Sequence, residues 1–280
     1  MGSDKLMLYF FSVGNGHSTL VLFPNGQTAL IDINISSGKH NPVSLLTSVG
    51  ITSLDYLIIT HPHRDHITGL AELMQTISVG AYVFSPAIFR PDPVYKDWQT
   101  YENIRTNVFL LWRPIFGHTV GGFLKQGTHV GGVSVKYIVP YWYFGPLQRT
   151  LDVNDLSLIV RLSYGANKIL ICGDTEEAGW KGVPDWQIKD TTLLLASHHG
   201  NKSGYHLPKI QVMAPKYVVI SAGQKTEADA DNRYKYHTDK WNNPFFVAVV
   251  GHTPKRLFTT RESGVLVVFN PLTMEKIVNV

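Results

Sequence analysis

The sequence predicts a layered α/β or α+β domain in which strands and helices are interspersed along the chain. Short apolar stretches separated by glycine and proline open the chain, and later apolar runs of strand length are interspersed with segments of helical spacing. The composition agrees, because 44% of the 280 residues are hydrophobic and 16% are charged, the balance of a chain that buries a sizeable core. The β-rich opening argues against a regular βαβ repeat.

The individual elements follow in chain order. Apolar stretches at 7–12, 19–23 and 28–33 predict an opening β-meander, since turn-forming glycine and proline residues separate them. A short helix is expected at 42–50, followed by a strand at 56–59. Further strands are expected at 133–139, 157–163, 168–172, 192–196, 216–221 and 264–269. Further helices are expected at 68–77, 96–108, 176–181 and 237–249.

The chain shows no fixed-period repeat and no low-complexity linker, which predicts a single domain over residues 1–280. Within it, residues 81–150 are predicted to be an irregular segment rich in aromatic residues, glycine and proline. The one cysteine, Cys172, excludes an internal disulfide and a thiolate metal cluster, and its apolar neighbours indicate a buried thiol. Any metal ion must therefore be held by histidine and carboxylate.

Charge and hydropathy restrict the partners. The formal net charge of +4 and the pI near 9.0 suit an anionic substrate, although many proteins share such a charge. No apolar run approaches the ~18–20 residues that span a bilayer, and the N-terminus lacks the features of a signal peptide. These observations predict a cytoplasmic protein without a membrane partner.

A cluster of metal-ligating residue types follows the strand at 56–59. His61, His63, Asp65 and His66 lie within six residues, directly after Thr60. His61 and His63 can project to one side of an extended turn that proline imposes between them. Asp65 and His66 are adjacent and point elsewhere, so they can serve a second ion. Imidazole and carboxylate ligands suit zinc, with manganese or iron as alternatives.

Further ligand types occur where later strands end. Asp174 closes the strand at 168–172, and His198 and His199 follow the strand at 192–196. Loops at strand ends gather into a site, so Asp174 is well placed to bridge two ions. Asp32 ends the third apolar stretch, and it is either an acceptor for a ligating imidazole or a turn-capping aspartate.

The run Thr60–His66 resembles the T-H-x-H-x-D-H motif of the metallo-β-lactamase superfamily. The segments 13–17, 154–158, 173–176, 197–204 and 260–264 are similar to one branch of it, which includes the hydrolase domain of the ComEC-type competence protein, a DNA-uptake channel, and a phosphorylcholine esterase. The resemblance covers about residues 7–270. It implies an αββα sandwich with two mixed sheets and a hydrolase that uses two divalent metal ions.

The resemblance also implies a role for each matching residue. His61 and His63 would hold the first ion, Asp65, His66 and His199 the second, and Asp174 would bridge them. Whether His198 or His199 is the ligand stays open, as does the last ligand of the first ion, because the superfamily's usual histidine is absent near Asn154. The remaining roles are catalytic for Asp65, His198, Glu176 and His237, outer contacts or ligation for Asn154 and Asp155, and substrate binding for Lys202 and Ser203. His17 stands where the branch commonly has aspartate, and His237 is either a substrate-side histidine or a helix start.

These features favour a phosphodiesterase, specifically a nuclease acting on single-stranded nucleic acid. Aromatic side chains for base stacking beside cations for phosphates would suit such a strand. They occur together in the segment 81–150: Tyr95, Trp98, Tyr101, Trp112, Tyr141, Trp142, Tyr143 and Phe144, with Lys96, Arg105, Arg113, Lys125 and Arg149. Alternatively, most of these aromatics pack onto the core. Two other functions stay open: a small-molecule phosphodiesterase for choline phosphate esters or cyclic nucleotides, and a non-catalytic module that binds nucleic acid or a partner protein.

Overall fold

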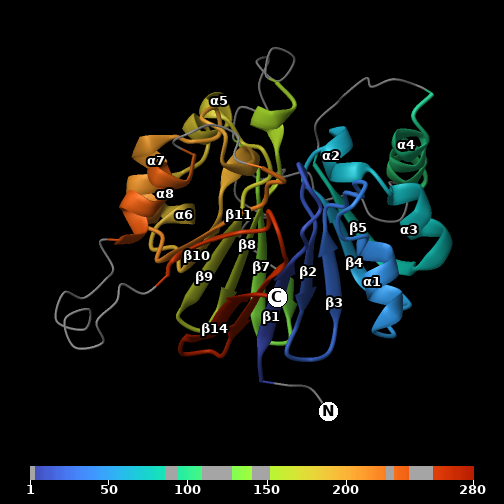
Figure 1. Cartoon of the computed structure of the whole chain (residues 1–280), viewed down its shortest axis with the longest axis horizontal. Coiled ribbons are helices and arrows are strands. Elements are labelled where there is room, and N and C mark those ends of the chain that lie inside the picture. The colour runs from blue at the N-terminus through green and yellow to red at the C-terminus, as the bar shows by residue number, and fades with distance from the viewer. Residues whose placement is uncertain (1–3, 86–93, 109–127, 141–151, 225–229, 240–254) are drawn as a thin grey trace.

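Two seven-stranded β-sheets pack face to face, with helices on both outer sides (Figure 1). The computed structural model describes residues 4–85, 94–108, 128–140, 152–224, 230–239 and 255–280. This is an αββα sandwich of two mixed sheets, so the predicted fold class is confirmed. None of the helices in these ranges is long and apolar enough to cross a membrane.

The first sheet comes from both ends of the chain, in the order β14-β13-β1-β2-β3-β4-β5. Its strands are β1 (Leu6–Phe10), β2 (Thr19–Leu22), β3 (Thr28–Ile31), β4 (Ser53–Ile59), β5 (Ser78–Phe84), β13 (Val265–Phe269) and β14 (Met274–Asn279). On its outer face lie α1 (Pro42–Ser48), α2 (Arg64–Ile67), α3 (Leu70–Thr76) and α4 (Lys96–Val108).

The second sheet has the order β12-β11-β10-β9-β8-β7-β6. Its strands are β6 (Thr128–Val130), β7 (Val133–Ile138), β8 (Ile159–Tyr164), β9 (Asn167–Ile171), β10 (Leu193–Leu195), β11 (Tyr217–Ile220) and β12 (Leu257–Thr259). Its helices are α5 (Glu177–Lys181), α6 (Asp185–Ile188), α7 (Leu207–Met213) and α8 (Ala230–Asp239), with short 3₁₀ turns at η4 (Asn154–Leu156) and η5 (Ser197–Gly200).

Strand direction changes in the same way within each sheet. Antiparallel pairs join β1 to β2 and β2 to β3, whereas β3, β4 and β5 are parallel. Likewise β6 to β9 are antiparallel neighbours, and β9 to β12 are parallel. Parallel neighbours need crossover connections, which explains why the helices follow the second part of each sheet. The loops that carry the candidate ligands follow these parallel strands.

The core has an inner layer and two outer layers. Between the sheets, a cluster of buried apolar side chains includes Phe10, Ile31, Ile171, Val219 and Phe269. In β1 buried and half-buried residues alternate, as the two-residue period of a strand requires. A second cluster lies beneath α1, α3 and α4, and a third lies beneath the helices of the second sheet. Cys172 belongs to the third cluster, and burial raises the pKa of its thiol, so the prediction of a buried thiol is confirmed.

The structure corrects three sequence-based expectations. The segment 81–150 is not irregular throughout: it contains the end of β5, the predicted helix α4 and the hairpin β6–β7, while 86–93, 109–127 and 141–151 lie outside the described residues. The helix expected at 237–249 begins earlier, at Ala230, and 240–249 is not among the described residues. Strands β5, β6, β12 and β14 were not predicted, because Gly80 interrupts the pattern of β5, β6 and β12 have three residues each, and β14 has no buried face.

Candidate metal centre

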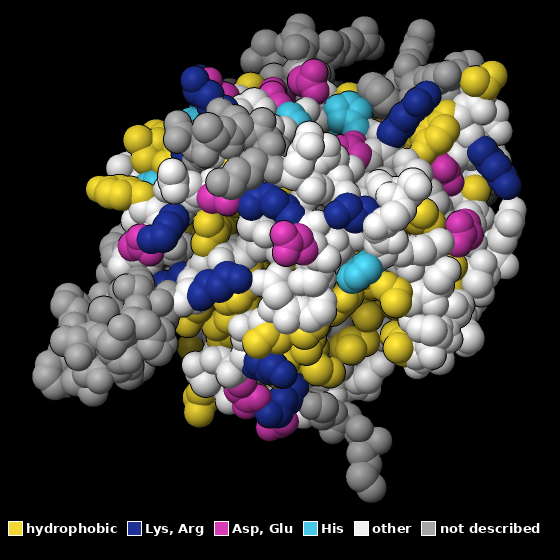
Figure 2. Space-filling model, in the orientation of Figure 1, with side chains coloured by type: hydrophobic (Ala, Val, Ile, Leu, Met, Phe, Trp, Pro, Cys, Tyr) yellow, Lys and Arg dark blue, Asp and Glu magenta, His cyan; other side chains and the backbone are white. Residues whose placement is uncertain are grey.

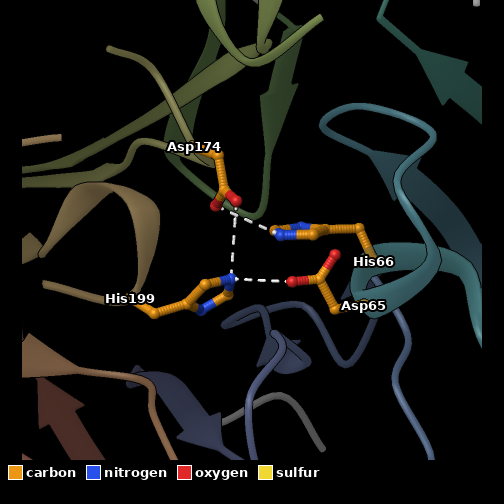
Figure 3. A group of neighbouring side chains, drawn as sticks. All are labelled: Asp65, His66, Asp174 and His199. Carbon is orange, nitrogen blue, oxygen red and sulfur yellow. Dashed lines mark ion pairs between the residues drawn. The ribbon is translucent and has the colours of Figure 1, made fainter. Parts of the chain in front are cut away.

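The site lies where loops after five parallel strands meet. Asp32 follows β3, His61 follows β4, Asp174 follows β9, His199 follows β10 and Ser221 follows β11. Ligands of open α/β sheets characteristically bind outside the carboxyl ends of parallel strands. Figure 3 shows Asp65 and His66, which come from α2 above the first sheet, facing Asp174 and His199 from the second sheet. The site is therefore built across the two halves of the sandwich.

Four side chains form the tightest group. One ligand atom from each of Asp65, His66, Asp174 and His199 lies within 4.8 Å of all the others. His66 Nε2 is 3.1 Å from Asp174 Oδ1, while His199 Nε2 is 3.4 Å from Asp174 Oδ2 and 3.2 Å from Asp65 Oδ2. Two imidazoles and two carboxylates thus converge on a small volume, the donor set that zinc, manganese and iron accept.

The hydrogen bonding of both imidazoles fits a metal ion. His66 Nδ1 lies 2.8 Å from Asp32 Oδ2, and His199 Nδ1 donates to the backbone carbonyl of Ser221 at 2.9 Å. The opposite nitrogens, His66 Nε2 and His199 Nε2, are buried and face carboxylate oxygens of Asp65 and Asp174, without a well-formed hydrogen bond among the described residues. A metal ion would take its ligands from these nitrogens and carboxylates, and a bond from the other ring nitrogen to a carboxylate or carbonyl is the usual arrangement of ligating histidines.

Electrostatics hold the metal-free cluster together. Burial lowers the pKa of His199, but Asp174 and Asp65 outweigh it and raise that pKa to about 10. Burial also lowers the pKa of His66, but Asp174 and Asp32 outweigh burial and raise the pKa of this imidazole well above its usual value. Burial opposes ionisation of Asp174, yet His199 and His66 hold its pKa well below the ordinary range. A metal cation would therefore replace protons on imidazoles that already face carboxylates.

His61 and His63 lie beside this group. His61 Nε2 is 3.2 Å from His63 Nδ1 and 3.8 Å from Asp174 Oδ2. Burial and the neighbouring His66 hold the pKa of His61 well below its usual value, so its imidazole is neutral and has a lone pair to offer. The structure thus brings His61 to the same carboxylate that His66 and His199 contact, with His63 beyond it.

His198 points to a different side from His199. Both residues have left-handed backbone angles, with φ of 49° and 54°, which non-glycine residues rarely adopt outside functional sites. His199 is buried, whereas the His198 side chain is 23% exposed. His198 Nδ1 is 2.6 Å from Glu176 Oε1, and its Nε2 lies 3.8 Å from Asp174 Oδ2. The backbone conformation therefore separates two adjacent histidines into a buried and an accessible one.

Besides Glu176, two predicted residues lie around His198: Ser203 contacts it directly, and Asn154 contacts Glu176. Ser203 Oγ lies 2.9 Å from His198 Nδ1, and Asn154 Nδ2 donates to Glu176 Oε1 at 3.3 Å. Ser203 was expected to bind substrate, but the contact that the structure shows is with His198. Asn154 reaches the site through Glu176.

Asp32 is an acceptor for several donors. It accepts from Thr60 N and Thr60 Oγ1, each at 2.6 Å, in addition to the contact with His66. His17 Nδ1 lies 2.9 Å from Asp32, and His17 Nε2 lies 2.8 Å from Thr19 Oγ1. His17, Asp32 and His66 also form a metal-compatible group, but both nitrogens of His17 are already bonded. Of the two interpretations offered for Asp32, the structure favours the acceptor for an imidazole of the cluster.

The three remaining predicted residues are Asp155, His237 and Lys202. Asp155 Oδ1 accepts from the backbone N–H of Gly179 at 2.7 Å, at the start of α5. His237 is buried in α8, and its Nε2 is 2.7 Å from Tyr205 Oη. Lys202 is exposed. Asp155 thus contacts α5, and His237 contacts the loop after Ser203. Neither residue belongs to the metal-compatible groups found among the described residues.

Sequence reasoning missed Thr60 and Ser221 as contacts of the site. Thr60 is the first residue of the motif, and its hydroxyl also lies 3.3 Å from His61 Nδ1. For Thr60, a hydroxyl residue directly after β4 was the available signal. Ser221 contacts His199 through its backbone carbonyl, an interaction that any residue type could make, so no sequence signal existed for it.

A sandwich of this topology with clustered histidine and aspartate at its strand ends defines a class of metal-dependent hydrolases. Residues 12–224 match the model of the Metallo-beta-lactamase superfamily. The chain belongs to that superfamily.

Two curated relatives indicate the branch. The chain is 26% identical over 207 residues to ComE operon protein 3 of Bacillus subtilis, covering 73% of this chain and 24% of that protein. It is 21% identical over 235 residues to competence protein ComA of Neisseria gonorrhoeae, covering 83% of this chain and 28% of that protein. The chain therefore spans about a quarter of the length of these relatives. The resemblance to the competence-protein branch is confirmed.

A solved structure agrees on the fold. Igni18, a metallo hydrolase from the archaeon Ignicoccus hospitalis, superposes with a TM-score of 0.50 at 15% identity, over 94% of this chain and 98% of that one. At this identity the likeness concerns the fold alone.

Proposed function

We propose that the chain is a dinuclear-metal-dependent phosphodiesterase that acts on single-stranded nucleic acid. The observation that carries the proposal is the position of Asp174. His66 approaches its Oδ1 at 3.1 Å, and its Oδ2 is approached by His199 at 3.4 Å and by His61 and His198 at 3.8 Å. Asp174 would bridge two ions, with zinc favoured and manganese or iron as alternatives. His61 and His63 would hold the first ion, and Asp65, His66 and His199 the second.

The side chains around the ions would divide the chemistry. Bound divalent ions at such a site activate water for attack and neutralise charge that develops on a phosphoryl oxygen. His198 is exposed enough to meet a substrate, and Glu176 and Ser203 fix the orientation of its ring. We assign to His198 Nε2 the delivery of a proton to the leaving oxygen. Glu176 would orient this imidazole.

Three observations support an anionic, extended substrate. The chain carries a net charge of +4, and one relative is named a competence protein. The guanidinium of Arg64, which lies between two candidate ligands in sequence, is 4.7 Å from the centroid of the Tyr95 ring. A cation stacked on an aromatic ring beside the site suits a phosphate and a base of one strand. Not every aromatic residue of the segment 81–150 can contact a substrate, since Tyr101 is buried against Phe84.

The other functions predict different substrate behaviour. A small-molecule phosphodiesterase would favour choline phosphate esters or cyclic nucleotides over oligonucleotides, and choline would compete. A non-catalytic binding module would bind nucleic acid without turnover. The two buried nitrogens that face carboxylates, His66 Nε2 and His199 Nε2, argue against this last alternative, because they suit ligation of a metal ion.

An activity panel tests the proposed substrate. We expect the protein loaded with zinc or manganese to hydrolyse single-stranded DNA or RNA faster than cyclic nucleotides or p-nitrophenylphosphorylcholine. Because phosphate contacts release counterions, kcat/KM on an oligonucleotide should fall steeply as salt rises from 50 to 200 mM, and Arg64→Ala should flatten that slope by about one unit. Salt-independent turnover of oligonucleotides, or preference for the choline ester, would contradict the proposal.

Replacing the adjacent histidines one at a time separates ligand from proton donor. We expect His199→Ala to lower the metal content by about one ion per chain, because its Nε2 faces Asp65 and Asp174. His198→Ala should keep both ions and lower kcat by roughly 10²-fold or more, as loss of a general acid does. Elemental analysis after gel filtration, together with steady-state rates, provides both readouts. If His198→Ala instead loses an ion while His199→Ala keeps both, His198 is the ligand and His199 the proton donor.

A further inference from the structure

The turn at residues 13–17 touches both halves of the candidate metal centre. On the side of the first sheet, His17 N donates to the backbone carbonyl of Asp65 at 3.1 Å. On the side of the second sheet, Ser221 Oγ donates to the carbonyl of Gly16 at 2.9 Å. The turn thus lies between one candidate ligand and the strand end that contacts another.

Ser221 connects this turn to His199. Its carbonyl oxygen accepts from His199 Nδ1 at 2.9 Å, while its hydroxyl holds Gly16. The Ser221 side chain is 2% exposed, so both bonds lie away from water. Since Nδ1 is held by a carbonyl, the ring of His199 is fixed with Nε2 toward Asp65 and Asp174.

A second bridge lies beside the first. Asn15 Oδ1 accepts from the backbone N–H of Gly223 at 3.0 Å, two residues beyond Ser221. The buried side chain of Asn34 in turn holds the turn from the first sheet, donating to the carbonyls of Val13 at 2.9 Å and Asn15 at 3.1 Å. Two independent hydrogen bonds therefore tie this turn to the end of β11.

Close backbone approach explains the glycine at position 16. A Cβ there would lie 2.7 Å from the carbonyl oxygen of Asp65 and 2.2 Å from Asn34 Nδ2, and φ is +153°. Only glycine lets the turn sit directly on the backbone of the ligand-bearing helix. Position 16 therefore requires glycine, because a side chain there would collide with the backbone of Asp65.

We propose that Asn15, Gly16 and Ser221 form a clamp that positions Asp65 and His199 across the two sheets, so that both reach the same metal ion. The inference rests on the proposed function, since it concerns the ion that Asp65, His66 and His199 would hold. The three residues act through the ligands and are positioning residues. Residues that orient ligands from behind typically change metal affinity by about 10–100-fold.

The stepwise zinc affinity of full-length variants, measured by competition with a chromophoric chelator, tests the clamp. Ser221→Ala and Asn15→Ala should each weaken one of the two binding steps by roughly 10–100-fold, the step that disappears in His199→Ala. The double variant should lose less than the product of the two single effects, because both bridges hold one turn. Asn15 is exposed, so its replacement leaves the core intact even if Ser221→Ala folds poorly.

Thr191→Val is the matched control. Thr191 is buried and its hydroxyl donates to the carbonyl of Ile188 at 2.7 Å, but it precedes β10, at the opposite end from His199. It should lower the unfolding temperature without changing either zinc affinity. Unchanged affinities in Asn15→Ala and Ser221→Ala, or an equal loss in Thr191→Val, would overturn the clamp. A parent protein that binds neither zinc nor manganese nor iron would instead refute the proposed function.

Discussion

An Asp174→Ala variant is expected to hydrolyse bis-p-nitrophenyl phosphate at least about 10³-fold more slowly than the parent. Loss of a single neutral group that stabilises transition-state charge already costs ~10²–10³ in kcat. Asp174 does more in the proposed mechanism, because its carboxylate is approached by the imidazoles of His61, His66, His198 and His199. Without it, neither ion would keep its shared ligand. Initial rates in zinc and in manganese give the measurement.

Stability has to be followed in the same experiment. Removing one member of a buried ion-pair group costs roughly 3–5 kcal/mol, so the variant should melt at a lower temperature. Rates are therefore compared where circular dichroism shows both proteins folded. Asp65→Ala should also abolish turnover, whereas Asp185→Ala, an exposed carboxylate paired with Lys209, should not. Retained turnover in both Asp174→Ala and Asp65→Ala would remove the two-ion mechanism.

Removal of metal is expected to abolish hydrolysis and to lower the melting temperature by on the order of 10 °C. A ligand present at a thousandfold its dissociation constant stabilises the native state by about 4 kcal/mol, and about 1 kcal/mol corresponds to ~2–4 °C in a chain of comparable size. The metal-free protein retains its ion pairs between imidazoles and carboxylates, so it should stay folded. Dialysis against a chelator, followed by calorimetry and rate measurements, tests this.

The control is the same chelator saturated with zinc, which should leave activity unchanged. Adding back zinc, manganese or iron one at a time should restore turnover, and the metal that gives the highest rate identifies the preferred cofactor. Full activity in a preparation that elemental analysis shows to be metal-free would refute a metal-dependent mechanism.

The sequence allowed the fold class and most candidate ligands to be predicted, for identifiable reasons. His61, His63, Asp65 and His66 lie within six residues and follow a recognisable strand, so local spacing was enough. Asp174 and the two histidines at 198–199 could be placed because parallel strands end at a common edge. The prediction of these ligands relied on the strands that precede them, which are short and strongly apolar.

The sequence could not supply the contacts that arise where loops fold against other parts of the chain. The pairing of Ser203 with His198 and of His237 with Tyr205 arises from loops that fold back, for which no periodicity gives a signal. The contacts of Asn15 with Gly223 and of Ser221 with Gly16 join residues about 205 positions apart. Strand β14, at the sheet edge and mostly exposed, carries too little alternation to be recognised.

The arrangement of the first sheet has a consequence for biosynthesis. Strand β1 pairs on one side with β13, whose residues are made some 250 positions later. Until that segment has left the ribosome, the first sheet lacks two of its strands and β1 has an open edge. A truncated chain that stops before β13 should therefore be less stable than the full chain, although it carries every candidate ligand.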